Sequence, residues 1–210
     1  NASRHYHGKK KSFLLFLLKY CKQVNVVNTN LANFYPPCIK TQVISPFLPP
    51  DETQEDLILQ SYPTGLVEFM MRKNIFVNSA WKYVKYKKTD LYGLEASIDA
   101  AFENKKINLL LAIGVYQPEL FSITARKKIE ELLKEKRLFL LTGQKELWPI
   151  FKFNPIFLRL TPYDGDSVSV REALYFGCKV IASNTVFRPD ECTLYPYADN
   201  DALLKIINEI

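Results

Sequence analysis

Residues 156–183 of this 210-residue chain read IFLRLTPYDGDSVSVREALYFGCKVIAS, and this stretch decides the fold. An apolar strand of residues 156–160 leads through a polar loop to a helix of residues 168–176 and then to a strand of residues 179–182. Because apolar strands that alternate with helices belong to parallel sheets, the stretch predicts an α/β fold. Ligands of such sheets bind beyond the carboxyl ends of the strands, so the loop of residues 161–167 is a candidate site.

The same alternation extends over most of the chain. A proline-rich connector at residues 45–50 can continue neither a helix nor a central strand, and it predicts a boundary between residues 1–47 and residues 48–210. Before it we expect a helix ending near Lys22 and strands at residues 24–27 and 40–45. After it we expect strands at residues 74–79, 107–115 and 138–141, and helices at residues 53–71 (broken near Pro63), 93–103, 118–136, 145–151 and 202–210.

Composition excludes several classes of protein. With 48% hydrophobic and 13% aromatic residues the chain can bury a core. The four cysteines form no C-x-x-C pair, which argues against a zinc knuckle or a disulfide framework and favours reduced thiols in the cytoplasm. The longest apolar run, residues 13–18, is too short for a membrane span, which needs about 20 residues, and we expect it to form the buried face of a helix.

Charge is distributed unevenly along the chain. Residues 1–50 carry seven basic side chains and no acidic one, whereas the remaining residues carry 21 basic and 22 acidic side chains. A basic surface suits anionic lipid headgroups or phosphorylated ligands, and without a nucleic-acid-reading motif we expect no nucleic acid partner. The alternative is a basic helix that is only solvated.

The loop of residues 161–167 combines groups that suit a sugar nucleotide. Asp164 is presented at the rim of the sheet, and Gly165 allows the backbone to approach a ligand. Ser167, Val168 and Ser169 then offer free N–H groups at a helix start, which is an anion site. Glu172 follows one turn into the helix, so carboxylates lie on both sides of the phosphate-binding amides.

These residues resemble those of the retaining glycosyltransferases with two Rossmann-like domains (the GT-B type), family 4 in particular. The family has two acids eight positions apart, as Asp164 and Glu172 are, followed by Glu-Ala, a glycine and a buried strand, matched here by residues 172–181. The resemblance implies a parallel-sheet, Rossmann-like C-terminal domain at residues 48–210 and a remnant of the N-terminal, acceptor-side domain at residues 1–47. It implies a UDP- or GDP-sugar donor, with no cofactor and no metal. The resemblance implies that the catalytic Asp164 contacts the donor sugar, that the loop amides bind the diphosphate and that Glu172 binds the ribose. The implied donor-binding residues are Gly165, Asp166, Ser167, Val168 and Glu172.

Two departures from the family concern the ligand. Asp164 is one methylene shorter than the usual glutamate. The family usually has an arginine after the first strand of this domain and a lysine a few residues later, both of which neutralise the diphosphate. Ala80 and Tyr92 occupy those regions here. Lys82, Lys85 and Arg188 are the tentative diphosphate cations.

The resemblance implies transfer of a sugar to a lipid-linked or oligosaccharide acceptor, as in bacterial capsule or lipopolysaccharide assembly. An anionic membrane surface on the inner face of the plasma membrane is then an expected partner. Because most of the first domain is absent, we expect donor binding but poor turnover. The alternatives are a sugar-nucleotide epimerase of the same fold and a non-catalytic nucleotide-binding module.

Simpler interpretations of the motifs also stay open. Ser169 and Glu172 fit a helix capping box, and Asp164-Gly165 is a common turn dipeptide. His5 and His7 are expected to be solvated, with an acceptor-side role as the alternative. The aromatic and basic loop of residues 81–88 suits a base or phosphate, or is simply a basic loop.

Overall fold

The computed structural model describes residues 7–87 and 89–210. The predictions for His5 and for Lys88 in the basic loop fall outside these ranges. The N-terminal part contains a helix and a pair of parallel strands with a short helix between them, and Val24 lies opposite Thr41 in the strand pair. Its elements are α1 (Gly8–Leu18), β1 (Val24–Val26), α2 (Thr29–Ala32) and β2 (Thr41–Val43).

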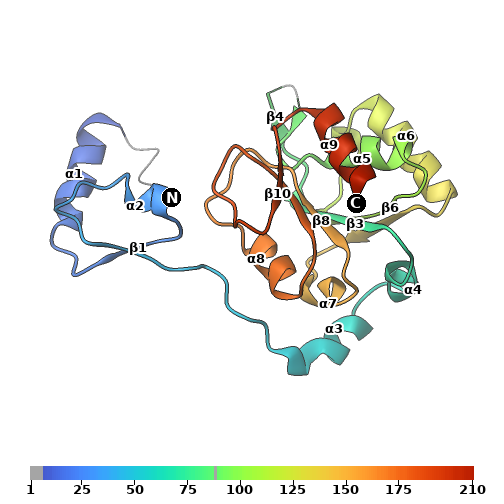
Figure 1. The fold of residues 1–210 in the computed structure, drawn as a ribbon, viewed down its shortest axis with the longest axis horizontal. Helices are drawn as coiled ribbons and strands as arrows, with labels where there is room; N and C mark the ends of the chain where they lie inside the picture. The colour runs from blue at the N-terminus through green and yellow to red at the C-terminus, as the bar shows by residue number, and fades with distance from the viewer. Residues whose placement is uncertain (1–6, 88) are drawn as a thin grey trace.

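Residues 44–51 have no helix or strand and lead from β2 toward α3 (Figure 1). This is the proline-rich connector at which the sequence predicts a domain boundary. The boundary itself stays a prediction. A 3-10 turn and two short α-helices then precede the main sheet: η2 (Glu52–Gln54), α3 (Glu55–Gln60) and α4 (Leu66–Met70).

A six-stranded, wholly parallel sheet forms the centre of the molecule, which confirms the predicted fold class. The spatial order is β10-β9-β8-β3-β6-β7, so successive strands are added first on one side of β3 and then, from β8 on, on the other side. The order reverses between β3 and β8, and this is where sheets of this type bind ligands. The strands are β3 (Ile75–Lys82), β6 (Asn108–Val115), β7 (Leu138–Thr142), β8 (Ile156–Arg159), β9 (Val180–Ser183) and β10 (Thr193–Tyr195).

Helices cover both faces of this sheet, and each face has its own apolar cluster (Figure 1). One cluster joins Phe76, Leu109 and Leu158 to the first set of helices: α5 (Leu94–Glu103), α6 (Ile123–Lys134) and α9 (Asn200–Glu209). The other joins Val77 and Phe157 to α4 and to two more helices: α7 (Trp148–Phe151) and α8 (Val168–Tyr175). Because neighbouring residues of a strand point to opposite faces, Arg159 lies on the same face as Phe157, that of α7 and α8.

The structure differs from the predicted elements most clearly in four places. Residues 13–18 do not form a buried helix face, because no residue of α1 is buried, and α1 ends at Leu18 rather than near Lys22. The predicted helix at residues 118–136 is a 3-10 turn, η3 (Pro118–Leu120), followed by α6, because the Ser122 hydroxyl caps α6 by accepting a hydrogen bond from the Ala125 N–H at 3.1 Å. The basic loop contains a small antiparallel hairpin, β4 (Lys85–Tyr86) and β5 (Thr89–Asp90). The edge strand β10 was not predicted, since three residues are too few to show a strand pattern.

Candidate functional site

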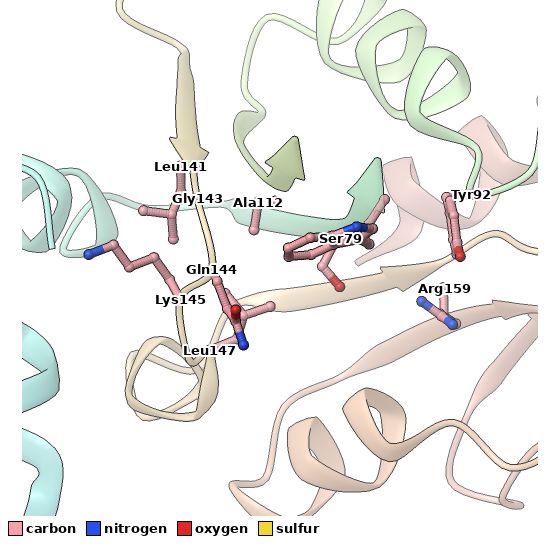
Figure 2. Close-up of a pocket in the computed structure, with 12 residues that line it drawn as sticks. Ser79, Tyr92, Ala112, Leu141, Gly143, Gln144, Lys145, Leu147 and Arg159 are labelled. Carbon is pink, nitrogen blue, oxygen red and sulfur yellow. The ribbon is translucent and has the colours of Figure 1, made fainter. Parts of the chain in front are cut away.

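A cavity of about 320 Å³ lies at the carboxyl ends of four adjacent strands, β8, β3, β6 and β7, and so spans the reversal in strand order (Figure 2). Its lining includes Ser79 and Trp81 from β3, Lys145 after β7 and Arg159 from β8. This is the position predicted from the topology. We refer to it as the switch-point cavity.

Trp81 forms one wall of the switch-point cavity, and Gly114 at the end of β6 makes room for it. A Cβ atom added to Gly114 would lie 2.4 Å from the Trp81 ring, which is closer than atoms can approach. The indole is 56% exposed. An exposed aromatic face beside a cavity can stack on a nucleobase.

The loop that follows β8 leads to α8, and Ser167 is the N-cap of this helix. The Ser167 hydroxyl accepts a hydrogen bond from the Val170 N–H at 3.4 Å and shares another with the Ser169 hydroxyl at 3.1 Å. A capping box between Ser169 and Glu172 would require Ser169 at the cap, so that interpretation is wrong. Within the described chain, no side chain caps the earlier Val168 and Ser169 amides, which have no partner inside a helix.

The other helix beside the reversal in strand order, α5, has its N-terminus filled by the chain itself. The buried Asp90 carboxylate accepts hydrogen bonds from the N–H groups of Tyr92, Leu94 and Glu95 at 3.0, 2.8 and 3.0 Å. These amides are therefore unavailable to a ligand. Of the two helix N-termini beside the reversal, that of α8 is the one open to an anion.

Asp164 holds two arginines at the rim of the sheet. Its two oxygens accept hydrogen bonds from Nε and Nη2 of Arg159, both at 2.9 Å, and one of them also accepts from Nη1 of Arg188 at 2.8 Å. Burial alone would raise the pKa of Asp164, but the two guanidinium groups outweigh it and hold the pKa below its ordinary value. Asp164 therefore stays ionised at neutral pH. The sequence singles out Asp164 as the group for the donor sugar, and that role stays a prediction.

Gly165 and Asp166, which the sequence also assigns to the donor, are held by neighbouring groups. The Gly165 carbonyl accepts a hydrogen bond from the side-chain amide of Asn28 at 2.8 Å, so the N-terminal part touches this loop directly. The Asp166 carboxylate, only 1% exposed, accepts from Nε of Arg171 at 3.1 Å. The Asp166 side chain is thus paired with Arg171 of α8, and its predicted contribution to the donor is through the backbone.

Glu172 lies in α8 without a cationic partner in residues 7–87 or 89–210. Burial, together with the negative charge of nearby Glu146, raises the pKa of Glu172 to about 7. A half-buried carboxyl without a cation is an acceptor for hydroxyl donors, so the position suits a ligand hydroxyl. Its assignment to ribose stays a prediction.

The three predicted diphosphate cations occupy different environments. Lys82 and Lys85 are exposed on β3 and β4, outside the switch-point cavity. Arg188 is only 1% exposed and donates to Asp164 and to the carbonyls of Thr161 and Ser183. Arg159 is the arginine that lines the cavity, and sequence analysis did not select it. The signal was present, because a charged residue interrupts an otherwise apolar strand one position before its predicted end.

A scan against protein-family models finds no match to this chain, and a search of curated proteins finds none either. Within the described ranges, His, Cys, Asp and Glu form no cluster of three or more that could hold a metal ion.

Solved structures provide clear similarities of fold. The chain is similar to HepE of Anabaena in complex with UDP, at 13% identity and a TM-score of 0.67, over 98% of this chain and 59% of that protein. Sucrose-phosphate synthase of Thermosynechococcus elongatus gives 18% identity and a TM-score of 0.59, over 99% of this chain and 53% of that one. A UDP-forming α,α-trehalose-phosphate synthase of Burkholderia xenovorans gives 10% identity and a TM-score of 0.64, over 99% of this chain and 56% of that one.

These proteins have the GT-B fold, and the chain spans just over half the length of each. At such identities the similarity shows the fold alone. The six-stranded sheet of this chain is therefore a Rossmann-like domain of the GT-B type. Membership of family 4 and the retaining stereochemistry stay predictions.

The environment of Glu172 predicts an unusual titration. We expect a midpoint near pH 7 in carbon-detected NMR, and a lower midpoint in Glu146→Gln, which removes the neighbouring negative charge. Because the folded protein holds this proton more tightly than the unfolded chain does, the group's contribution to the free energy of unfolding falls as the pH rises from about 4.5 to about 7. Glu172→Gln should remove that part of the pH dependence. A midpoint between pH 4 and 5 in the parent would contradict this description of the site.

Proposed function

We propose that the chain is the donor-binding part of a glycosyltransferase and that its donor is a nucleoside-diphosphate sugar. The observation that carries the proposal is the open N-terminus of α8, which has guanidinium groups on one side and the Glu172 carboxyl beyond it, next to the switch-point cavity. Amides and cations suit phosphates, a carboxyl suits hydroxyls, and a cavity with an aromatic wall suits a base.

The donor would lie along this row of groups. The base would enter the switch-point cavity beside Trp81, the ribose hydroxyls would meet Glu172, and the diphosphate would meet the Val168 and Ser169 amides. Solved structures of HepE are complexes with UDP and with UDP-glucose, and this supports a uridine donor as the first to test.

The proposed reaction is transfer of the sugar to a hydroxyl of a lipid-linked or oligosaccharide acceptor, as in bacterial surface-polysaccharide synthesis. The amides of α8 and the nearby cations would stabilise charge as it develops on the leaving diphosphate. Asn28 already contacts the Gly165 carbonyl, so an acceptor held by the N-terminal part would lie close to the donor. An epimerase would need catalytic groups on both sides, and residues 1–50 contain no carboxylate side chain.

We also propose that α1 binds an anionic membrane surface. No residue of α1 is buried. Phe13, Phe16 and Leu17 of α1 are exposed, at spacings of three and four that place them along one side of the helix, and the exposed Tyr20 follows its end. Lys9, Lys10 and Lys11 precede them, so cations lie next to exposed apolar side chains, and this combination suits an anionic membrane surface. Within the described ranges, no helix has the length and apolar character needed to span a bilayer.

The donor site can be tested by removing one amide without changing a side-chain contact of the ligand. Val168 is the first residue of α8, a position that tolerates proline, and Ser167 before it has the extended backbone, with ψ of 115°, that a following proline requires. We expect calorimetric titration to show UDP binding by the parent and at least roughly tenfold weaker binding by Val168→Pro, since a hydrogen bond to a charged group is lost.

Val168→Ala is the matched control, because it shortens the same exposed side chain and keeps the amide. It should bind UDP as the parent does. If Val168→Pro also does so, the phosphate is not at this helix. If neither UDP nor GDP, free or as sugar conjugates, binds to the parent, the donor proposal is wrong.

The membrane proposal predicts an effect of charge. Replacing Lys9, Lys10 and Lys11 with alanine should weaken sedimentation with phosphatidylglycerol-containing vesicles by roughly a hundredfold, at about 1 kcal/mol for each cation. The control replaces three exposed lysines of the C-terminal part with alanine, namely Lys73, Lys134 and Lys205. This variant should bind the vesicles nearly as well as the parent does. Equal binding of the parent to purely zwitterionic vesicles would rule out an anionic surface as the partner.

A further inference from the structure

Arg159 is the guanidinium group that lines the switch-point cavity. It ends β8, on the α8 side of the sheet, and its side chain is 14% exposed. In Figure 2 it lies near Ser79 of β3 and Tyr92 of the loop before α5. The Tyr92 ring lies 5.5 Å from its guanidinium carbon, so the group is also held by a cation–π contact.

Asp164 fixes the orientation of Arg159 and leaves part of it available. Nε and Nη2 of Arg159 form a two-pronged ion pair with the carboxylate, the geometry in which an arginine is held most firmly. Nη1 has no hydrogen-bond partner among the residues that the structure describes. Two N–H bonds at the edge of the cavity are thus free to bind an anion.

The charge balance of the cluster is positive. Arg159 and Arg188 share the single Asp164 carboxylate, while Asp166 is neutralised separately by Arg171. Arg188 is almost fully buried, and its three guanidinium nitrogens donate hydrogen bonds to Asp164 and to the carbonyls of Thr161 and Ser183. It is therefore not available to a ligand. The uncompensated charge therefore faces a ligand through Arg159.

Other cations near the cavity do not occupy this position. Lys145 lines the opposite side, but its ammonium group donates to the Ser61 carbonyl and projects away from Arg159 (Figure 2). Ser79, Ala80 and Tyr92, which line the cavity beside Arg159, carry no positive charge. Arg159 is the cationic group best placed for phosphate at this edge of the sheet.

We propose that Arg159 binds the diphosphate of the donor and that Asp164 is a positioning residue, which acts by holding Arg159 rather than by contacting the sugar. The inference rests on the proposed function, since it assumes a nucleoside-diphosphate ligand. It differs from the sequence-based assignment, in which Asp164 meets the donor sugar and Lys82, Lys85 or Arg188 meets the diphosphate.

The test of Arg159 compares ligands with and without phosphate. We expect Arg159→Met to weaken UDP binding about tenfold to a hundredfold in calorimetry, and to leave uridine binding in ligand-observed NMR unchanged, because a hydrogen bond to a charged group is lost with UDP alone. Arg159→Lys, which keeps the charge but not the two-pronged pair, should fall between the parent and Arg159→Met. Arg137→Met is the matched control, since it breaks an arginine–glutamate pair of a similarly buried arginine outside the cavity, and it should bind UDP as the parent does.

Comparing UDP with UDP-glucose distinguishes the two possible roles of Asp164. If Asp164 positions Arg159, Asp164→Asn should weaken the binding of UDP and of UDP-glucose by the same factor. If Asp164 contacts the sugar, the substitution should weaken the binding of UDP-glucose alone. UDP binding by Arg159→Met equal to that of the parent would overturn the inference while leaving the proposed function intact. Failure of the parent itself to bind any nucleotide would instead overturn the proposed function.

Discussion

The ion cluster of Asp164 with Arg159 and Arg188 is the interaction on which the rest of the site depends. Arg188 comes from the segment after β9 and Arg159 from the end of β8, so one carboxylate joins the ends of two adjacent strands to the loop before α8. Buried charges are costly unless they are paired and hydrogen-bonded. Here the carbonyls of Thr161 and Ser183 complete the bonding of Arg188. The loop geometry and the positive charge near α8 thus have the same origin.

Capping distinguishes the starts of α8 and α5, and it is why we place the proposed anion site at α8. Both helices begin at the carboxyl edge of the sheet, on the two sides of the reversal in strand order. In α5, three amides are bonded to Asp90, and Gly93 lets the helix start close to β8: a Cβ there would lie 2.4 Å from that of Leu160. In α8, a single serine hydroxyl caps the helix and leaves the first amides open. Two similar helix starts therefore differ in the amides that they can offer to a ligand.

The sequence predicted the fold well where the patterns are strong. Long apolar strands such as β6, and the strand–loop–helix–strand unit around Asp164, appear close to their predicted positions. Short elements such as β10 escaped prediction, because three residues carry no periodicity. For the candidate site, the spacing of Asp164 and Glu172 picks out the loop in the sequence. The contacts of the loop could not be predicted, because the pairing of Asp164 with Arg188 joins residues 24 positions apart and has no local signature. The contact between Asn28 and Gly165 is longer in range still.

The proposed position of the donor can be tested with a crystal structure of the chain grown with UDP. We expect the diphosphate within hydrogen-bond distance of the Val168 and Ser169 amides and of Nη1 of Arg159, with the ribose beside Glu172 and the base in the switch-point cavity. UDP bound at the start of α5, or with its diphosphate on Lys82 or Lys85 and away from α8, would contradict it.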